Sequence, residues 1–330
     1  MSQIYLSLPG SKLRLKNGRY VVTLRDEILL ETPSEGIQEV ILLGGTQITT
    51  QAMRHLLTHQ ARLHLLTQEE RHIGTLEPTQ NTKTDTLRAQ VRQTDRLEWR
   101  LETAKTIVKA KLENTRIVLQ RLARDHPTST LAKEAAEFQR LAIESIQTAT
   151  SENEVRGYEG IAAQAHFAVL SEIIPSHWEF STRERRPPPD AINAMLSFGY
   201  TLLLTRIISA LQSAGLHIGI GCLHVSHGTR PALALDLMEE FRAALVDRFV
   251  LNIALRELLK PSDFMQTSQG CRFSSQARDH FIRLWEARIQ TTILHQDKTL
   301  TYARLIRSQA KDFAAYIRLE IPTYQPLRIR

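Results

Sequence analysis

The spacing of apolar residues changes along this chain, and the change falls near residue 81. Before it, short runs of alternating apolar and polar residues are separated by Gly, Pro and Asn, a pattern typical of strands and tight turns. After it, apolar residues recur every three or four positions, as on one face of a helix. The sequence therefore predicts an α+β fold, with a small β-rich domain (1–80) ahead of a larger all-helical domain (87–330). The polar segment NTKTDT (81–86) is predicted to link them.

The β-rich region contains one hairpin that its turn residues define. In LRLKNGRYVV (13–22), Asn17 and Gly18 accept the positive φ angles of a two-residue turn, so the flanking runs are predicted to pair. Thr49 or Thr50 is expected to cap a short helix that continues to Gln60. The other predicted strands are QIYLSL (3–8), EILLET (27–32), QEVILL (38–43) and RLHLLT (62–67), and RHIGTLEP (71–78) closes the region.

The helical region opens with a long apolar repeat that Pro127 ends, which predicts a long helix from residue 87. The apolar positions of this repeat are Leu87, Val91, Leu97, Leu101, Ala104, Val108, Leu112, Thr115 and Leu119. Further helices are predicted over 130–149, 153–174, 190–214, 231–258, 274–292 and 298–319.

The charge balance of the chain favours a polyanionic partner. There are 42 Lys and Arg residues against 35 Asp and Glu, which gives a net charge of +7, and nucleic acid is the usual partner of such an excess. The two cysteines, Cys222 and Cys271, indicate no disulfide framework and fit a reducing environment. The N-terminal MSQIYLSLPG lacks the features of a secretion signal, and charges interrupt the apolar runs before membrane-spanning length. We therefore expect a cytoplasmic protein.

The segment GCLHVSHGTRPALALDLMEEFR (221–242) places carboxylates in an apolar context shortly after a histidine. Asp236 and Glu239 are three positions apart, so they share one face of a helix that begins after Pro231. From this stretch alone two interpretations stay open: a solvated acidic face, or oxygen ligands of a metal ion. His224 is likewise either a hydrogen-bonded structural histidine or a nitrogen ligand.

A third acidic candidate, Glu159, lies in RGYEGIAAQAHF (156–167), beside small residues that would permit close helix packing. A carboxylate there is costly to bury unless it is paired or metal-bound. The alternative is a position in the first turn of a helix, where the helix dipole stabilises the charge. If Glu159, His224 and the carboxylate pair converge, their oxygen and nitrogen atoms would suit Mg²⁺ or Mn²⁺. Spacing in the sequence does not establish that convergence.

Five motifs in order along the chain resemble those of one family, the CRISPR-associated adaptation integrases (CRISPR-associated protein one). The resemblance implies an N-terminal β-sandwich-like domain through which the protein dimerises, and a helical catalytic domain that depends on a divalent metal. The motifs are GGTQITTQAMRHLL (44–57), EGIAA (159–163), RRPPPDAINAMLSFGY (185–200), GCLH with LALDLMEEFR (221–224 and 233–242), and DFMQTSQGCRFSSQARDHFI (263–282).

The resemblance also assigns roles to residues of this chain. The family's metal ligands fall on Glu159, His224 and Glu239, and a further acidic residue of the site falls on Asp236, either as a ligand or behind one. The ion is expected to be Mg²⁺ or Mn²⁺. No position of these motifs is lost, so an inactive homologue is not expected.

The activity that the resemblance implies is a transesterification on DNA. The 3′-hydroxyl of a short foreign duplex is joined to a phosphodiester at the edge of a CRISPR repeat, in a complex where CRISPR-associated protein two bridges two dimers. One phosphodiester replaces another, so no nucleoside triphosphate is needed, in agreement with the absence of GxxxxGK[ST]. Two alternatives remain: a related transposon-type integrase, and a non-catalytic scaffold that binds nucleic acid.

Two groups of arginines are candidates for binding DNA phosphates. Arginines recur every four residues through the start of the long predicted helix, and a second cluster precedes the prolines 187–189. Such residues are either phosphate contacts or ordinary solvated surface, and the second cluster could instead anchor its loop. The candidates are Arg88, Arg92, Arg96 and Arg100 in the first group, and Arg183, Arg185 and Arg186 in the second.

Overall fold

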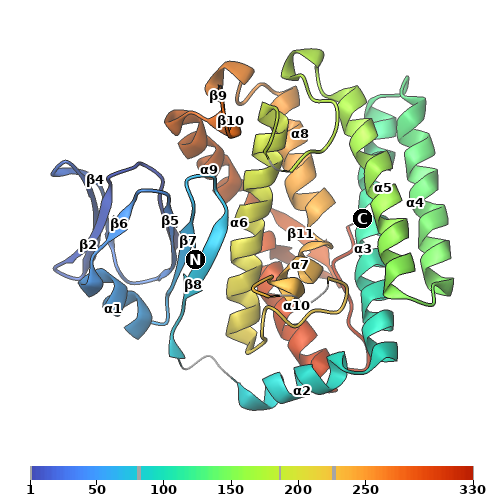
Figure 1. Ribbon diagram of the computed structural model, residues 1–330, viewed down its shortest axis with the longest axis horizontal. Helices are drawn as coiled ribbons and strands as arrows, with labels where there is room; N and C mark the ends of the chain where they lie inside the picture. Colours follow the sequence, from blue (N-terminus) through green and yellow to red (C-terminus); the bar gives the residue numbers. More distant parts are fainter. Residues whose placement is uncertain (1, 80–82, 186, 225–227, 330) are drawn as a thin grey trace. The chain divides into compact units, whose positions relative to one another are not determined.

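A computed structural model of the chain describes residues 2–79, 83–185, 187–224 and 228–329. The chain divides into two compact units, residues 1–81 with 273–280, and residues 82–272 with 281–330. The first unit is rich in strands and the second is mostly helical (Figure 1), so the predicted α+β fold is confirmed. One boundary differs from expectation, because α2 begins at Thr84, within the segment predicted as a linker.

Within the described residues, the first unit contains two four-stranded sheets, ordered β1-β5-β7-β8 and β4-β3-β2-β6. In the first sheet β1, β5 and β7 run parallel and β8 is antiparallel; in the second, β2, β3 and β4 form a meander that β6 joins in parallel. The strands are β1 (Ser2–Leu6), β2 (Lys12–Lys16), β3 (Arg19–Leu24), β4 (Glu27–Pro33), β5 (Ile37–Leu43), β6 (Gln47–Ile48), β7 (Arg62–Leu66) and β8 (His72–Leu76).

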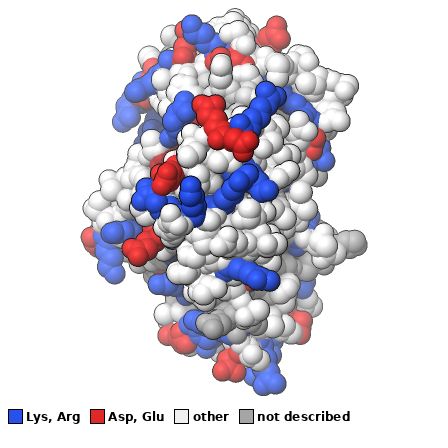
Figure 2. All heavy atoms as spheres, turned by 90° about the vertical axis from the view of Figure 1, so that its left-hand side faces the viewer, with Lys and Arg blue, Asp and Glu red and all other residues white. Residues whose placement is uncertain are grey.

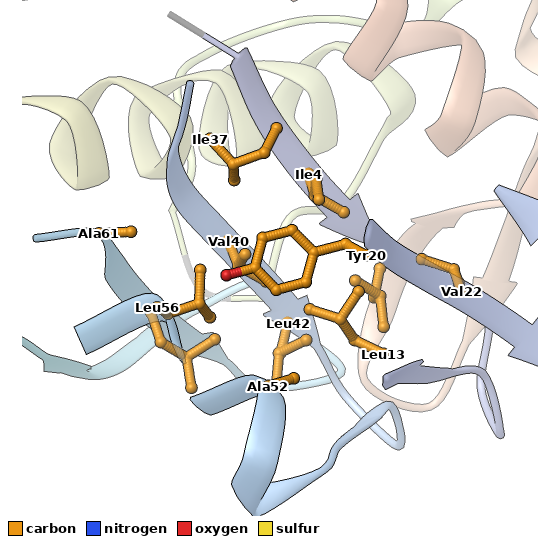
Figure 3. Close-up of a cluster of buried hydrophobic side chains, with 12 residues drawn as sticks. Ile4, Leu13, Tyr20, Val22, Ile37, Val40, Leu42, Ala52, Leu56 and Ala61 are labelled. Carbon is orange, nitrogen blue, oxygen red and sulfur yellow. The ribbon is translucent and has the colours of Figure 1, made fainter. Parts of the chain in front are cut away.

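The predicted hairpin and helix cap are both present in this unit. Asn17 and Gly18 have φ angles of 48° and 71°, and β2 pairs with β3 across them. Helix α1 (Thr50–Thr58) begins after Thr49, whose hydroxyl accepts the backbone N–H of Ala52. Apolar residues of both sheets and of α1 form one core, shown in Figure 3. That core consists of Ile4, Leu6, Leu13, Tyr20, Val22, Ile37, Val40, Leu42, Ala52, Leu56, Ala61 and Leu63.

The second unit is built around long helices, of which α3, α4 and α5 lie side by side (Figure 1). Apolar residues of these three helices, with Leu223 from the loop after α6, form a continuous buried cluster. The α-helices after residue 82 are α2 (Thr84–Thr94), α3 (Leu97–Asp125), α4 (Thr130–Thr148), α5 (Glu152–Ile173), α6 (Ala191–Ala214), α7 (Ala232–Met238), α8 (Arg248–Leu255), α9 (Ser275–Ile289) and α10 (Tyr302–Ile317). The start of α9, up to His280, belongs to the first unit. Shorter helical segments are the 3₁₀ turns Ser176–Trp178 and Pro261–Asp263, and the π-helical segment Arg242–Asp247.

The apolar repeat that starts at residue 87 does not form one helix. The chain leaves the helical conformation at Arg96, which has extended backbone angles. Val91 and Leu97 are exposed, although both fit the repeat. Helix α2 is held by Gln90, whose amide donates to the carbonyls of His217 and Ile220. A tertiary contact of this kind lies far away in the sequence and leaves no periodic signal.

Two further expectations for the helical region are wrong in detail. The helix predicted over 231–258 is broken into α7, a turn that carries Glu239 and Glu240, the π-helical segment and α8. The region is also not all-helical, because it contains two antiparallel hairpins. Their strands are β9 (Phe264–Thr267) with β10 (Gly270–Phe273), and β11 (Thr292–His295) with β12 (Lys298–Thr301).

Helix α6 is, among the described residues, the one helix whose length and apolar composition would allow it to cross a bilayer. However, 78% of its most apolar window is buried inside the protein. That burial is typical of the core helix of a globular unit, and α6 begins with an ordinary cap in which Asp190 accepts the backbone N–H of Asn193.

Candidate metal centre

Two carboxylates from different helices meet at one ammonium group. Glu159 lies in α5 and Glu239 in the turn that follows α7, 80 positions later in the chain. The Nζ atom of Lys111 in α3 contacts Oε1 of Glu159 and lies 2.6 Å from Oε2 of Glu239. The two acidic residues predicted as ligands are therefore brought to a common point by three elements of the second unit.

Two of the alternatives considered from the sequence, for the acidic pair and for Glu159, do not agree with the structure. The side chain of Glu239 is 5% exposed and that of Asp236 is fully buried, so a solvated acidic face is the wrong interpretation. Helix α5 begins at Glu152, which places Glu159 about two turns inside the helix and beyond the first-turn effect of the dipole. The close packing expected of the small residues after Glu159 occurs at Ala162, which is fully buried, whereas the space beside Gly160 is open.

Glu239 is held in its charged form by neighbouring cations. Burial raises the pKa of its carboxyl, but Arg242, Lys111 and His224 outweigh this effect and bring the pKa well below its ordinary value. The Nε atom of Arg242 lies 2.9 Å from Oε1 of Glu239. For Lys111, burial lowers the pKa, whereas Glu239 and Glu159 raise it, and the net shift is upward. Glu239, Lys111 and Arg242 are therefore charged at neutral pH.

The imidazole of His224 is oriented through one of its two nitrogens. Its Nδ1 lies 2.7 Å from Oδ1 of Asp236, and its Nε2 lies 4.0 Å from Oε1 of Glu239. An ionised carboxylate only accepts hydrogen bonds, so Nδ1 carries the proton in this pair. In the neutral ring the lone pair is then on Nε2, on the side of Glu239, which is the form in which histidine binds a metal.

Asp236 is anchored by the loop that precedes it. Its two oxygens accept the backbone N–H groups of Cys222, Leu223 and His224 in addition to the imidazole. A Cβ atom at Gly221 would come within 2.7 Å of Oδ2 of Asp236, so only glycine allows the loop to approach so closely. The backbone of the Gly-Cys-Leu-His motif thus binds the carboxylate of Asp236, and this carboxylate orients His224.

The turn that carries Glu239 is fixed from its other side by the C-terminal segment. Glu240 is buried and accepts hydrogen bonds from the hydroxyl of Tyr324, at 2.7 Å, and from the backbone N–H of Leu327. Asn114, one turn beyond Lys111 in α3, donates to the carbonyls of Glu240 and Leu327 and accepts the N–H of Ile329. Burial raises the pKa of the Glu240 carboxyl to about 8, so this carboxyl is largely protonated at neutral pH, whereas that of Glu239 is ionised.

The predicted ligands fit a divalent cation in kind, although they do not yet enclose one. Among the described residues, no three His, Cys, Asp or Glu side chains form a closed metal-binding group. The reason is local: the ammonium of Lys111 lies between the carboxylates, and His224 is 4.0 Å from the nearer of them. Two carboxylates that already share a cation, with an oriented imidazole beside them, nevertheless provide the donor set that Mn²⁺ and Mg²⁺ accept.

A pocket in the second unit opens beside Glu159 and is lined by basic groups. Lys111, Arg183, Arg185 and Arg242 contribute to its wall, with the aromatic ring of Tyr200. The guanidinium groups of Arg183 and Arg242 lie 5.5 and 4.7 Å from the centre of that ring. This arrangement concentrates positive charge next to the carboxylate pair, which suits an anionic ligand such as phosphate.

The lining of this pocket also contains the buried carboxylate of Asp247. His166 Nε2 lies 3.0 Å from Oδ2 of Asp247, and the Tyr200 hydroxyl donates to the other oxygen.

Sequence reasoning missed Lys111, Arg242 and Tyr200. Arg242 follows Glu239 by three positions, the spacing of a helical ion pair, and that was a usable signal. For Lys111 there was no comparable signal in the sequence beyond its position on the long helix.

The predicted arginine stripe does not lie on one helix. Arg88 and Arg92 are exposed on α2, whereas Arg96 lies between α2 and α3 and donates to Gln93. Arg100 is on α3 and is paired with Glu152. The predicted stripe is therefore wrong as a single face, although Arg88, Arg92 and Arg96 are each exposed.

The second arginine cluster also divides. Arg183 is largely enclosed, and its guanidinium donates to Asn193 and Ser197 on α6, so it is anchored within the protein. Arg185 is exposed. Arg186 lies outside the described residues.

Comparison with known proteins assigns the chain to a family. The sequence profile described as CRISPR associated protein Cas1 matches residues 4–287. The chain belongs to the Cas1 family. A Cas1 relative named CRISPR-associated endonuclease Cas1 3, from Thermus thermophilus, is 31% identical over 333 residues, which cover 100% of this chain and 96% of the relative. CRISPR-associated endonuclease Cas1 1 from Chlorobaculum tepidum is 31% identical over 336 residues, with 99% and 98% covered. The family resemblance inferred from the motifs is thereby confirmed.

Solved structures support the Cas1 fold. A casposase bound to an integration product is similar with a TM-score of 0.89 at 22% identity, over 100% of this chain and 95% of that one. A Cas6-RT-Cas1–Cas2 complex matches with a TM-score of 0.85 at 25% identity, over 99% of this chain and 36% of the longer chain. A Cas1 protein from Thermotoga maritima matches with a TM-score of 0.82 at 21% identity, over 96% of this chain and 97% of that one.

Proposed function

We propose that this Cas1-family chain is a divalent-metal-dependent DNA integrase and endonuclease of CRISPR spacer acquisition. The observation that carries the proposal is the convergence of Glu159 and Glu239 on one cationic nitrogen, with the Nε2 atom of His224 4.0 Å from Glu239. The names of the relatives, all CRISPR-associated endonucleases, support the same activity. In this account Glu159, His224 and Glu239 hold one Mg²⁺ or Mn²⁺ ion.

The chain's own residues would prepare the site for phosphodiester chemistry. Asp236 keeps the proton on Nδ1 of His224, so that Nε2 is free to bind, and Arg242 keeps Glu239 ionised. A bound divalent ion would supply Lewis acidity toward the reacting hydroxyl and phosphate oxygens. The arginines of the neighbouring pocket, Arg183 and Arg242, would balance the charge of the phosphate that enters.

The reaction proposed is a strand transfer. The 3′-hydroxyl oxygen of a short foreign duplex attacks a phosphorus atom at the edge of a CRISPR repeat, and the 3′-oxygen of the repeat strand leaves with a proton. One phosphodiester bond forms and another breaks, so the exchange needs no nucleoside triphosphate. With water in place of the 3′-hydroxyl, the same site would act as an endonuclease.

The proposed partners are double-stranded DNA, a second copy of the chain and a Cas2 protein that bridges two dimers, in the cytoplasm. The Cas1–Cas2 composition of a structurally similar complex supports the Cas2 partnership. Strand β4, at the edge of its sheet, exposes Ile28, Leu29 and Leu30, an apolar edge that supports dimerisation through the first unit.

DNA contacts are proposed for Arg88, Arg92, Arg96, Arg100 and Arg185, with Arg183 inside the pocket and Arg186 retained from the sequence. The support for these contacts comes from the position of each arginine taken by itself. On the face of the molecule drawn in Figure 2, basic and acidic side chains are interspersed among uncharged ones. A uniform basic field on that face is therefore not the basis of the proposal, which rests on individual arginines.

Strand transfer into a supercoiled plasmid that carries CRISPR repeats tests the proposal. The assay is run with Cas2 and a short duplex, with Mg²⁺ or Mn²⁺, and again with chelator. We expect integration products that chelator abolishes, and that Glu159→Ala and His224→Ala each remove. Glu134→Ala, which deletes an exposed carboxylate of the neighbouring helix α4, is the matched control. Full activity of either site variant would overturn the assignment.

The same assay separates the two alternatives. A non-catalytic scaffold would bind the duplex and give no products under any metal condition. A transposon-type integrase would transfer the duplex without Cas2 and without preference for the repeat. The casposase match is a likeness of fold at 22% identity and does not by itself favour that alternative.

A further inference from the structure

Lys111 lies where a metal ion would have to lie if Glu159 and Glu239 were its ligands. Its Nζ atom contacts one carboxylate and lies 2.6 Å from the other. Its side chain is 13% exposed, and the two carboxylates are 25% and 5% exposed. The contact is therefore enclosed by the protein and is unlike the solvated ion pairs found at the ends of long surface side chains.

The physical need for a cation at this point is strong. Two carboxylates that approach the same point repel each other unless a positive group lies between them, and partial burial weakens the screening of that repulsion. Of the two carboxylates, Arg242 contacts only that of Glu239, and His224 is held by Asp236. Among the described residues, Lys111 alone contacts Glu159 and Glu239 together. It thus supplies the charge that allows these two side chains to remain together without a metal.

We propose that Lys111 is an internal counter-ion that competes with the divalent cation for Glu159 and Glu239 and leaves them when the metal binds. This inference rests on the metal site of the proposed function. The pocket lined by Lys111 and Glu159 gives the displaced ammonium a place to move, among other basic groups. Metal binding would thereby release one cation toward the position expected for a DNA phosphate.

The opposite role for Lys111 makes the opposite prediction. If the lysine only held the carboxylates in place for the metal, its removal would loosen them and weaken metal binding. If it occupies their shared point, its removal abolishes a competitor and tightens metal binding. The sign of the change in affinity therefore decides between the two roles.

The test is a titration with Mn²⁺ alone, followed by the electron paramagnetic resonance signal of the free ion, on the full chain. We expect Lys111→Met to lower the Kd for Mn²⁺ by about tenfold or more, the size of one charge-assisted hydrogen bond. Lys109→Met, on the same helix and with the same change in charge, should leave the Kd unchanged. An unchanged or higher Kd for Lys111→Met would overturn the proposal.

Two additions keep the outcome clear. Lys111→Arg retains the charge and should bind Mn²⁺ no more tightly than the wild type. If Lys111→Met fails to fold without metal, its melting temperature is followed as Mn²⁺ is added, because a ligand of the folded state raises it. Recovery at Mn²⁺ concentrations below the wild-type Kd supports the proposal, and no recovery contradicts it.

This titration also distinguishes failure of the inference from failure of the proposed function. A wild-type chain that binds no Mn²⁺ would reject the metal site itself. A wild-type chain that binds Mn²⁺ with the same affinity as Lys111→Met would reject only the role of the lysine. Neither result depends on strand transfer.

Discussion

The Nδ1 atom of His224 lies 2.7 Å from Oδ1 of Asp236, and the same carboxylate binds the backbone of the loop from which the histidine projects. One buried side chain therefore fixes both the ring and its loop. Asp236 is one turn before Glu239, so the orientation of His224 is tied to the segment that carries a proposed ligand. Asp236 acts in this account as a positioning residue.

Replacing Asp236 by Asn should weaken Mn²⁺ binding by about 10- to 100-fold, the usual effect of removing a carboxylate behind a metal-binding histidine. The amide cannot accept every hydrogen bond that the carboxylate accepts, so the ring loses its fixed tautomer. The Kd for Mn²⁺ measures the effect, with the exposed Asp125→Asn as control. Wild-type affinity in Asp236→Asn would show that the pairing with His224 has no role in metal binding.

Asn114 is predicted to be a major determinant of stability in the second unit. Asn114→Ala leaves the carbonyls of Glu240 and Leu327 and the N–H of Ile329 without their partner. Each buried group without a hydrogen bond costs about 1 to 3 kcal/mol, so the free energy of unfolding should fall by about 2 to 4 kcal/mol, allowing for partial relaxation. Urea unfolding checks this, with the exposed Gln120→Ala on the same helix as control. Equal losses in the two variants would contradict the predicted role of the C-terminal segment.

The stability of the first unit should depend on the protonation of His72. Burial lowers the pKa of this imidazole below the 6.5 of a free histidine. Below pH 6.5 the unfolded chain therefore binds more protons than the folded chain, and the free energy of unfolding falls as the pH is lowered. His72→Gln should make the loss between pH 7.5 and 5.5 smaller, as measured by urea unfolding. The half-exposed His177→Gln is the control, and an identical pH dependence in wild type and His72→Gln would reject the prediction.

Arg92 and Arg96 are predicted to contact DNA phosphates. Their joint replacement by Ala should weaken duplex binding and reduce the slope of log K against log salt by about 1 to 2, since each phosphate contact contributes about 0.9. The double variant Arg124→Ala with Arg256→Ala removes the same charge from exposed positions elsewhere. If both double variants keep the wild-type slope, the first pair belongs to ordinary solvated surface.

Local signals in the sequence were sufficient for the strand-rich unit and for most helices. The Asn17-Gly18 turn and the Thr49 cap need particular residues at particular positions, and the structure has both. The break between α2 and α3 was not predicted, because the helical spacing of apolar residues continues through Arg96. The two short hairpins after residue 260 were missed because strands of four residues are too short to show a period.

The site was only partly predictable, for a similar reason. Motifs pointed to Glu159, His224, Asp236 and Glu239, and the structure brings all four into one neighbourhood. Lys111 comes from a helix whose other lysines and arginines look the same in the sequence. Only the packing of α3 against α5 and the turn after α7 distinguishes it.

The central claim is that Glu159, His224 and Glu239 hold one divalent ion, and a Mn²⁺-binding isotherm of the full chain tests it most directly. The account predicts one site per chain in the wild type and in Glu134→Gln. It predicts that Glu159→Gln, His224→Ala and Glu239→Gln each weaken that site by about tenfold or more. If the three variants, correctly folded, bind Mn²⁺ with the stoichiometry and affinity of the wild type, the metal centre is not at these residues.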